Sequence, residues 1–356
     1  MSTVSVFLDL WEPVYMRRRV LTRLIISGSL VAFLIWRVDI AEALQTLTDV
    51  NYVYALPALS LFTLAKFIFA VRWKVILERL GQPPLGSLFG TLLVSNMANN
   101  VLPLRLGDLL RVQVPAQRHG ISRSGLTSSV FITETLLDGL TFAVLGLVGV
   151  ALLEVPGVLN DFVWAMIGGV VTGLLLAVLG AHLTVPAGWQ PGRWLRWLPE
   201  KGRSAIAEIL PPFVVGLAAL RHPRMGGQVL ALSIVAWLLE GTMFWLFGLA
   251  FGLDLSFGSY LMIMITANMV ISIPLAPSNV GPYEVAVAEV VAILGVARPV
   301  AGGYAIATHL LNILWVTFTG LIAMWLLHLR PQDIFYLRTP ERTPTTANPE
   351  GLEKAP

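Results

Sequence analysis

The chain has 356 residues, of which 56% are hydrophobic and 13% are charged, and its formal net charge is +3 at pH 7. The charged fraction is about half the roughly 25% that is typical of soluble domains, and apolar runs of about 20 residues are long enough to cross a hydrocarbon core of roughly 30 Å. These features exclude a disordered chain, a water-soluble enzyme and a nucleic-acid-binding module, and they predict an all-α polytopic membrane protein.

Six apolar stretches are long enough to be full membrane spans, and they lie at residues 21–38, 52–71, 126–152, 160–183, 228–251 and 299–328. Three further apolar stretches are short or interrupted, at residues 85–102, 205–220 and 259–295. Lys and Arg cluster beside alternate spans, beginning with Arg17, Arg18 and Arg19, and such clusters favour the cytoplasmic side of a membrane. We therefore expect a multi-pass protein of the plasma membrane with both termini in the cytoplasm.

The chain divides into one long membrane unit and a short tail. Residues 1–330 hold all the apolar stretches and are predicted to form a single transmembrane domain. Residues 331–356 are rich in Pro, Thr and charged residues, a composition that favours a disordered cytoplasmic tail.

The stretch 85–102 is too short to cross the bilayer. A helix from Ser87 to Asn100 would be about 21 Å long at a rise of about 1.5 Å per residue. Topology requires both ends of this stretch on the same side of the membrane, which predicts a re-entrant hairpin whose break is buried in protein or lines a wet cavity. The stretch 259–295 follows the same pattern, because its apolar run breaks at PLAPSNVGP and then resumes.

The two interrupted stretches resemble each other. SLFGTLLVSNMANNVLP at 87–103 aligns with SYLMIMITANMVISIP at 259–274, which pairs Asn96 with Asn268. The similarity predicts two inverted-topology repeats at about 87–152 and 259–328, because one copy would dip from the inside and the other from the outside. Chance similarity between apolar segments is the alternative. Inverted repeats with broken helices place binding sites near the middle of the membrane.

Charged side chains inside the apolar stretches mark candidate binding residues, because a charge in hydrocarbon costs roughly 2.5–3.5 kcal/mol. Glu134 and Asp138 are predicted to lie one helical turn apart and to share a face. They serve a substrate, or else they form a buried pair with Arg105 or Arg111 that locks the fold. Glu240 lies in the middle of its span and is expected to belong to a cavity.

Other polar residues of the spans have a structural and a functional interpretation each. Lys66 and Arg72 lie near one end of a span and are expected to extend toward the headgroups. His309 and Asn312, one turn apart, are expected to make a hydrogen-bonded helix contact or to contact a substrate. Glu284 follows the second break, where it would cap the next helix or bind a substrate.

Arg105 and Arg111 follow the first break. An Arg guanidinium can hold a phosphate through two parallel hydrogen bonds, so these residues are expected to bind a lipid phosphate, unless they act only as cytoplasmic-side charges. The full set of candidate substrate-binding residues is Asn96, Asn100, Arg105, Asp108, Arg111, Glu134, Asp138, Glu240, Asn268, Glu284, His309 and Asn312.

Signals for catalysis are missing from the sequence. It holds no G-x-x-x-x-G-K-S/T motif and no Cys, and its five His residues lack the spacing of metal ligands. We therefore predict no catalytic residue, no metal site and no cofactor, and we favour a protein that is not an enzyme, although scattered carboxylates leave an enzyme open.

Two motifs are similar to those of a known family. The motif P-x-R-x-G-D/E-x-x-R is found at Pro103, Arg105, Gly107, Asp108 and Arg111. The motif P-x-x-P-x-x-x-G-x-x-E is found at Pro274, Pro277, Gly281 and Glu284. Over about residues 20–328 the chain resembles the lysylphosphatidylglycerol synthase transmembrane-region family of flippase-like membrane proteins.

The resemblance implies a membrane protein that binds or translocates a phospholipid, polyprenyl or hopanoid-type lipid. One alternative is an accessory protein or enzyme of glycolipid or polyprenyl-phosphate glycosylation, and another is a non-transporting scaffold. No aminoacyl-transfer domain follows the membrane region in this sequence, so aminoacyl transfer is not implied. The expected partners are a membrane lipid and either a second copy of the chain or a lipid-modifying enzyme, with no nucleic acid.

Overall fold

The computed structural model describes residues 42, 45–78, 80–102, 105–152, 161, 164–165, 167–169, 172, 203, 223–273 and 276–330. All regular structure within these ranges is helical, which confirms the predicted all-α fold for this part of the chain. The predicted spans 21–38 and 160–183, the stretch 205–220 and the tail 331–356 lie wholly or almost wholly outside the described residues, as do Pro103 and Pro274.

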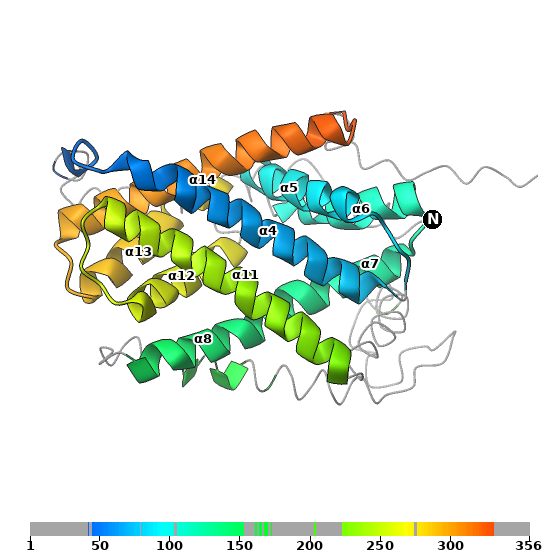
Figure 1. Ribbon diagram of the computed structural model, residues 1–356, viewed down its shortest axis with the longest axis horizontal. Helices are drawn as coiled ribbons and strands as arrows, with labels where there is room; N and C mark the ends of the chain where they lie inside the picture. The colour runs from blue at the N-terminus through cyan, green and yellow to red at the C-terminus, as the bar shows by residue number, and fades with distance from the viewer. Residues whose placement is uncertain are drawn as a thin grey trace, which may run out of the picture.

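Within the described ranges, four helical segments are long and apolar enough to cross a membrane. They are α4 (Ala55–Leu77), the run of α7 (Arg123–Phe131), η3 (Ile132–Leu137) and α8 (Asp138–Leu152), then α11 (Pro223–Ala250) and α14 (Arg298–Leu326). A single 3-10 turn, η1 (Tyr52–Tyr54), precedes α4. These segments correspond to four of the six predicted spans, and they lie side by side as a bundle (Figure 1).

The second of these segments is not a uniform α-helix. Between α7 and α8 the backbone forms a π-helix, η3, which contains Glu134 and ends one residue before Asp138. A π turn holds more residues than an α turn, so residues four apart no longer stack directly, and such turns are frequent at functional sites.

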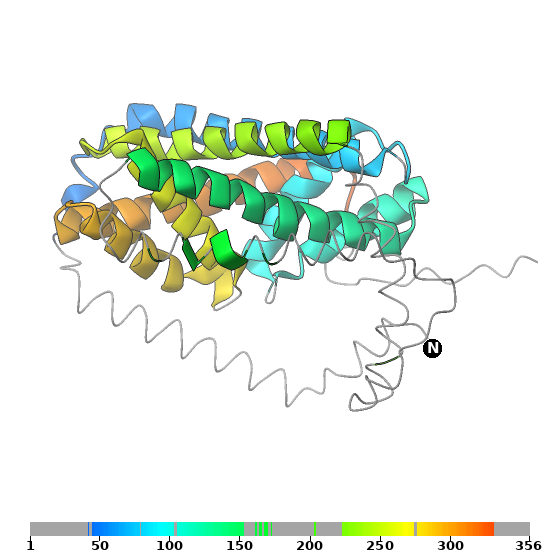
Figure 2. The same cartoon turned by 90° about the horizontal axis from the view of Figure 1, so that it is seen from below.

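Two broken helices form hairpins at opposite ends of the bundle (Figures 1 and 2). The first hairpin is α5 (Leu85–Val101) followed by α6 (Asp108–His119), and Ser87 near the start of α5 lies 2.9 Å from His119 at the end of α6. The second hairpin is α12 (Phe257–Ser272) followed by η6 (Pro277–Asn279) and α13 (Pro282–Ile293). The expectation that both interrupted stretches fold back on themselves is met by this arrangement.

The breaks carry unusual backbone conformations and approach each other. Arg105 in the first break has a φ of 56°, and Ser278 and Asn279 in the second have φ values of 47° and 52°. These angles lie in the left-handed region, which non-glycine residues seldom adopt. Ser278 Oγ donates to the backbone carbonyl of Asn100 at 2.5 Å, so the tips of the two hairpins meet inside the bundle.

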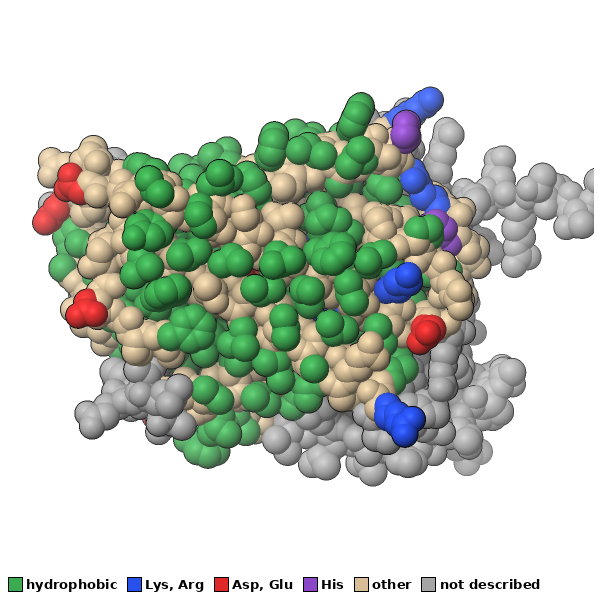
Figure 3. Space-filling model, viewed as in Figure 1, with side chains coloured by type: hydrophobic (Ala, Val, Ile, Leu, Met, Phe, Trp, Pro, Cys, Tyr) green, Lys and Arg blue, Asp and Glu red, His purple; other side chains and the backbone are tan. Residues whose placement is uncertain are grey.

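The bundle is packed inside and apolar outside. Trp73, Tyr260 and Tyr304 are fully buried, whereas Leu314, Phe318 and Trp325 on α14 are 57%, 55% and 74% exposed. In Figure 3 hydrophobic side chains cover the middle of the visible face. Lys, Arg and His gather at the end that holds the first hairpin, together with one acidic side chain, and the other visible Asp and Glu side chains lie at the opposite end. An apolar belt between polar ends is the surface that a bilayer requires.

Candidate functional site

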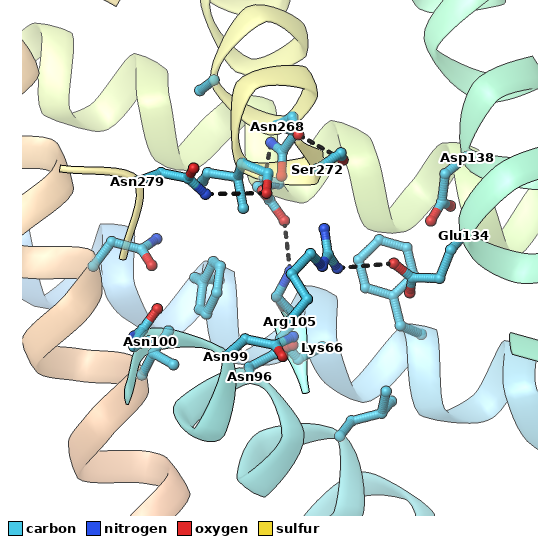
Figure 4. A pocket seen from close by; sticks show the side chains of 18 of the residues that line it. Lys66, Asn96, Asn99, Asn100, Arg105, Glu134, Asp138, Asn268, Ser272 and Asn279 are labelled. Atoms are coloured by element: carbon cyan, nitrogen blue, oxygen red, sulfur yellow. Dashed lines mark hydrogen bonds and ion pairs between the residues drawn. The ribbon is translucent and has the colours of Figure 1, made fainter. Parts of the chain in front are cut away.

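A cavity of about 180 Å³ lies between the long helices at the two hairpin breaks. Figure 4 shows polar side chains that line it from α4, α5, η3, α8 and α12 and from both breaks. Four cations line it, at Lys66, Arg72, Arg105 and Arg111, together with three carboxylates, at Glu134, Asp138 and Glu240. The apolar bundle therefore encloses a polar chamber that is rich in both signs of charge.

Most of the predicted site residues meet in this cavity. Ten of the twelve line it, and they are Asn96, Asn100, Arg105, Arg111, Glu134, Asp138, Glu240, Asn268, His309 and Asn312. The other two, Asp108 and Glu284, do not line it, but each contacts a residue that does. Their assignment as substrate-binding residues stays a prediction.

The first break is held by an ionic cluster around Glu134. Arg105 donates from Nε to Asp108 Oδ2 at 3.0 Å and from Nη2 to Glu134 Oε2 at 3.3 Å. Arg111 donates from Nη1 to Glu134 Oε1 at 2.5 Å. Asn99 adds a hydrogen bond from Nδ2 to Asp108 Oδ1 at 2.9 Å. One carboxylate thus serves two guanidinium groups, and its side chain remains 35% exposed.

Asp138 belongs to a different pair from the predicted one. It contacts Arg72 at 2.5 Å and accepts from the Trp237 indole at 3.0 Å, while Arg72 also donates to Ser233 at 2.8 Å. Arg72 is only 2% exposed, so the expectation that it extends toward the headgroups is wrong. The physical reason is that α11 packs along α4 and closes off the outward path. It also supplies Ser233 as a partner for Arg72 and Trp237 as a partner for Asp138.

Lys66 is also turned inward rather than toward the headgroups. Its ammonium lies 3.1 Å from Glu240 Oε2, and it sits 4.4 Å from the ring centre of Phe62 and 5.1 Å from that of Phe69. Aromatic faces attract a cation, so the rings and the carboxylate together hold the ammonium in the cavity. Asn268 donates to Glu240 Oε1 at 2.9 Å, which places both predicted residues in one group.

Glu284 combines the predicted cap with an unpredicted contact to His309. Its Oε2 accepts from the backbone N–H of Gly281 at 2.7 Å, in the first turn of α13. Its Oε1 lies 2.6 Å from His309 Nδ1, and the His309 ring stacks on Tyr283 with the ring centres 4.0 Å apart. The capping role is confirmed, and so is the hydrogen-bonded helix contact expected of His309, which joins α14 to Glu284 on α13.

Amide side chains form the neutral part of the cavity wall. Asn96, Asn100 and Asn312 lie there with Asn279, which the sequence analysis did not select. Asn279 donates from Nδ2 to the backbone carbonyl of Ile271 at 3.1 Å, which closes the end of α12. Its position inside PLAPSNVGP was the signal that could have identified it.

Metal ligation has no evident support here. Among the described residues, no three His, Asp or Glu side chains are grouped as metal ligands would be. The expectation of no metal or cofactor stays a prediction.

The helix lengths, the apolar belt and the buried polar chamber define an integral membrane protein of the helical-bundle class. The sequence model of the lysylphosphatidylglycerol synthase TM region matches residues 20–320, so the chain belongs to that family, as its motifs predicted.

Two curated relatives are similar to most of the chain. "Glycosyltransferase AglD" of Haloferax volcanii is 27% identical over 335 residues, covering 83% of this chain and 53% of that protein. A "UPF0104 membrane protein" of Methanothermobacter thermautotrophicus is 26% identical over 271 residues, covering 71% of this chain and 77% of that protein. The chain therefore spans about half the length of the glycosyltransferase.

Proposed function

We propose that this protein binds the polar headgroup of a membrane lipid in the cavity and carries it across the bilayer. The observation that supports this most is a chamber with four cations inside an apolar bundle. Charges at such depth are costly and are usually kept for a polar substrate or ion path. The lipid is of the phospholipid, polyprenyl or hopanoid type, and its tails would remain in the surrounding hydrocarbon.

The first hairpin supplies the phosphate contacts in this proposal. The side chains of Arg105 and Glu134 are 24% and 35% exposed, so their 3.3 Å contact is open to competition from a ligand. A phosphate could replace Glu134 as the acceptor for the guanidinium of Arg105, because both present oxygens that suit two parallel hydrogen bonds. The protein would exchange an internal ion pair for one with its substrate.

A second candidate function follows from the similarity to a protein named as a glycosyltransferase. In this alternative the chain presents a glycolipid or polyprenyl-phosphate headgroup to a glycosylating enzyme and does not move it across the membrane. The same cavity would serve both functions. Measuring whether a bound lipid changes leaflets distinguishes them.

The arrangement of the hairpins supports a further part of the proposal, that the chain contains two inverted repeats. In each hairpin a carboxylate occupies the first turn of the second helix, Asp108 on α6 and Glu284 on α13. The aligned pair Asn96 and Asn268 lines the cavity from the first helix of each hairpin. Opposed hairpins would give the headgroup one equivalent path from each side of the membrane.

The test of headgroup binding is the substitution Arg105→Lys. Lys keeps the positive charge but loses the planar pair of donors, so binding of labelled phosphatidylglycerol in phosphatidylcholine nanodiscs should weaken severalfold. Arg118→Lys on the exposed end of α6 is the matched control and should bind as the wild type does. Equal binding by the Arg105→Lys and wild-type proteins would refute the phosphate role of Arg105.

The orientation is tested by single-cysteine labelling, which is clean because the chain has no native Cys. We propose that the end holding the first hairpin faces the cytoplasm. Asp254→Cys, between α11 and α12, should then react with an impermeant reagent added outside intact cells. Gln82→Cys, between α4 and α5, should react only after permeabilisation. External labelling at Gln82→Cys would contradict both the orientation and the re-entrant path of α5.

A further inference from the structure

One carboxylate beside the cavity differs from the others in its partner. Asp108, Glu134, Asp138 and Glu240 each contact a Lys or Arg, which stays charged at any physiological pH. Glu284 instead contacts His309, whose charge depends on pH. The side chains of Glu284 and His309 are 12% and 6% exposed, so this pair is nearly removed from water.

The hydrogen-bond pattern indicates where a proton can be added. When Glu284 is ionised its carboxylate only accepts, so the 2.6 Å contact is then a hydrogen bond donated by His309 Nδ1 to Glu284 Oε1. The other ring nitrogen, Nε2, then has a free lone pair in neutral His309. With neutral His309 the pair has a net charge of −1, and a proton bound at Nε2 makes the pair neutral overall.

Among the described residues, neither Glu284 nor His309 forms an ion pair with a Lys or Arg, and Arg298, on the same helix as His309, contacts Glu289 instead. Tyr283 on α13 stacks on His309, and Tyr304 lies five residues earlier on α14. Glu240 on α11 also lines the cavity but already contacts Lys66 of α4. The remaining polar side chains in the lining from α5, α12 and α14 are neutral, at Asn96, Asn99, Asn100, Asn268, Ser272 and Asn312.

We propose that Glu284 and His309 form a proton-binding pair that takes up one proton when an anionic lipid headgroup enters the cavity. This rests on the proposed headgroup binding. The phosphate brings a negative charge into the same chamber that His309 lines, which raises the cost of a second net negative charge at the pair. A proton from water in the cavity then binds Nε2, and it leaves again when the headgroup departs.

The coupling is reciprocal, because binding free energies are linked. If headgroup binding favours protonation, protonation must favour headgroup binding to the same extent. A transported phosphate accompanied by one proton also crosses without net charge, so a pH gradient would drive the lipid toward the more alkaline side. The pair would couple the movement of the lipid to the pH gradient, which would supply the energy.

The experiment measures the affinity for labelled phosphatidylglycerol in phosphatidylcholine nanodiscs between about pH 5 and 8, the interval in which His titrates. In the wild type, the affinity should increase by up to about tenfold per unit decrease in pH, the limit for one linked proton. Calorimetry in buffers of different ionisation enthalpy should detect a net uptake of up to one proton on binding.

Two variants test whether the pair is responsible. Glu284→Gln keeps an oxygen that can accept from the Gly281 N–H, and His309→Gln keeps an amide that can donate to Glu284. Either variant should bind with an affinity that no longer depends on pH. Glu289→Gln is the matched control, since that carboxylate lies on the same helix, is 31% exposed and contacts Arg298. It should retain the wild-type pH dependence.

The possible failures are separable. Wild-type binding that is independent of pH, or a folded Glu284→Gln protein with the wild-type pH dependence, overturns the proton-binding pair and leaves headgroup binding intact. Failure of the wild type to bind the anionic lipid at every pH overturns headgroup binding and this inference with it. If neither variant folds, the wild-type proton count decides, and a value of zero overturns the inference.

Discussion

The two hairpins enclose one cavity but are held by different forces. In the first, permanent charges dominate, because Arg105 bridges Asp108 and Glu134 and Arg111 joins the same Glu134. In the second, neutral hydrogen bonds close the break, from Asn279 to the Ile271 carbonyl and from Ser278 to the Asn100 carbonyl. Similar backbone paths are therefore stabilised by different chemistry.

Under the proposed function, this difference gives the two hairpins different tasks. Fixed cations near a partly exposed carboxylate select a ligand by its sign of charge, because a competing anion can take the place of the carboxylate. Neutral amides are indifferent to sign and can adapt to varied hydroxyl or carbonyl groups. The second hairpin instead carries Glu284, whose partner His309 on α14 can change its charge with the pH of the solution.

The largest expected effect is a loss of stability on neutralising Asp138, which should exceed the loss on neutralising Glu134 in the same helical segment. Asp138→Asn leaves Arg72 charged, 2% exposed and without its counter-charge, which should lower the free energy of unfolding by about 3–5 kcal/mol. Thermal unfolding in detergent and the folded fraction on size-exclusion chromatography measure this. Stability close to the wild type would show that the Arg72–Asp138 pair does not lock the bundle.

Glu134→Gln is the variant to compare with Asp138→Asn. Neutralising Glu134 leaves Arg111, which is 4% exposed, without its counter-charge. Glu134 itself is 35% exposed, however, so water can take its place beside Arg111, and Arg105 keeps its contact with Asp108. Its loss of stability should therefore be clearly smaller than that of Asp138→Asn. Equal losses would show that the carboxylate shared by two Arg residues is as structural as the buried one.

The sequence was sufficient for features that depend on local patterns. The four described spans follow from apolar length, and both hairpins follow from runs too short to cross before a break. Ten candidate residues meet in one cavity because polar groups in apolar segments must share whatever polar space the bundle holds. The exact count of six spans and the repeat symmetry stay predictions.

Pairing between distant residues could not be predicted in the same way. Arg72 and Asp138 are 66 positions apart, and Lys66 and Glu240 are 174 positions apart. No local spacing encodes such contacts, since the first joins α4 to α8 and the second depends on how α11 packs on α4. The π-helix at Glu134 could not be predicted from local spacing either. It explains why Glu134 and Asp138, which were expected on one face, reach different partners.

A smaller effect is expected from the glycine of each hairpin, for different reasons. A Cβ at Gly107 would overlap the backbone carbonyl of Ser95 and the side chain of Asn99, so Gly107→Ala must push α5 and α6 apart. Gly281 has a φ of 95°, which an Ala residue adopts only with strain. Each substitution should cost about 1–3 kcal/mol of stability by thermal unfolding.

The two glycine variants should also differ in lipid binding. Gly107→Ala should also weaken phosphatidylglycerol binding, because it displaces the loop that carries Arg105. Gly281→Ala should leave the affinity at a low, fixed pH less affected, because it lies in the hairpin without permanent cations. Equal losses of affinity in the two variants would argue that the hairpins do not divide the work as proposed.

The smallest expected effect concerns the contact between the hairpin tips. Ser278→Ala removes the hydrogen bond to the Asn100 carbonyl and leaves that acceptor near the end of α5 without this donor, at a cost of about 0.5–1.5 kcal/mol. Ser278 also has a φ of 47°, which glycine adopts without penalty. Ser278→Gly should therefore lose the same hydrogen bond yet be more stable than Ser278→Ala. Thermal unfolding of the wild type, Ser278→Ala and Ser278→Gly separates the contribution of the hydrogen bond from that of the backbone strain. If Ser278→Ala were as stable as the wild type, the contact between the tips would not contribute to stability. The two hairpins could then move independently.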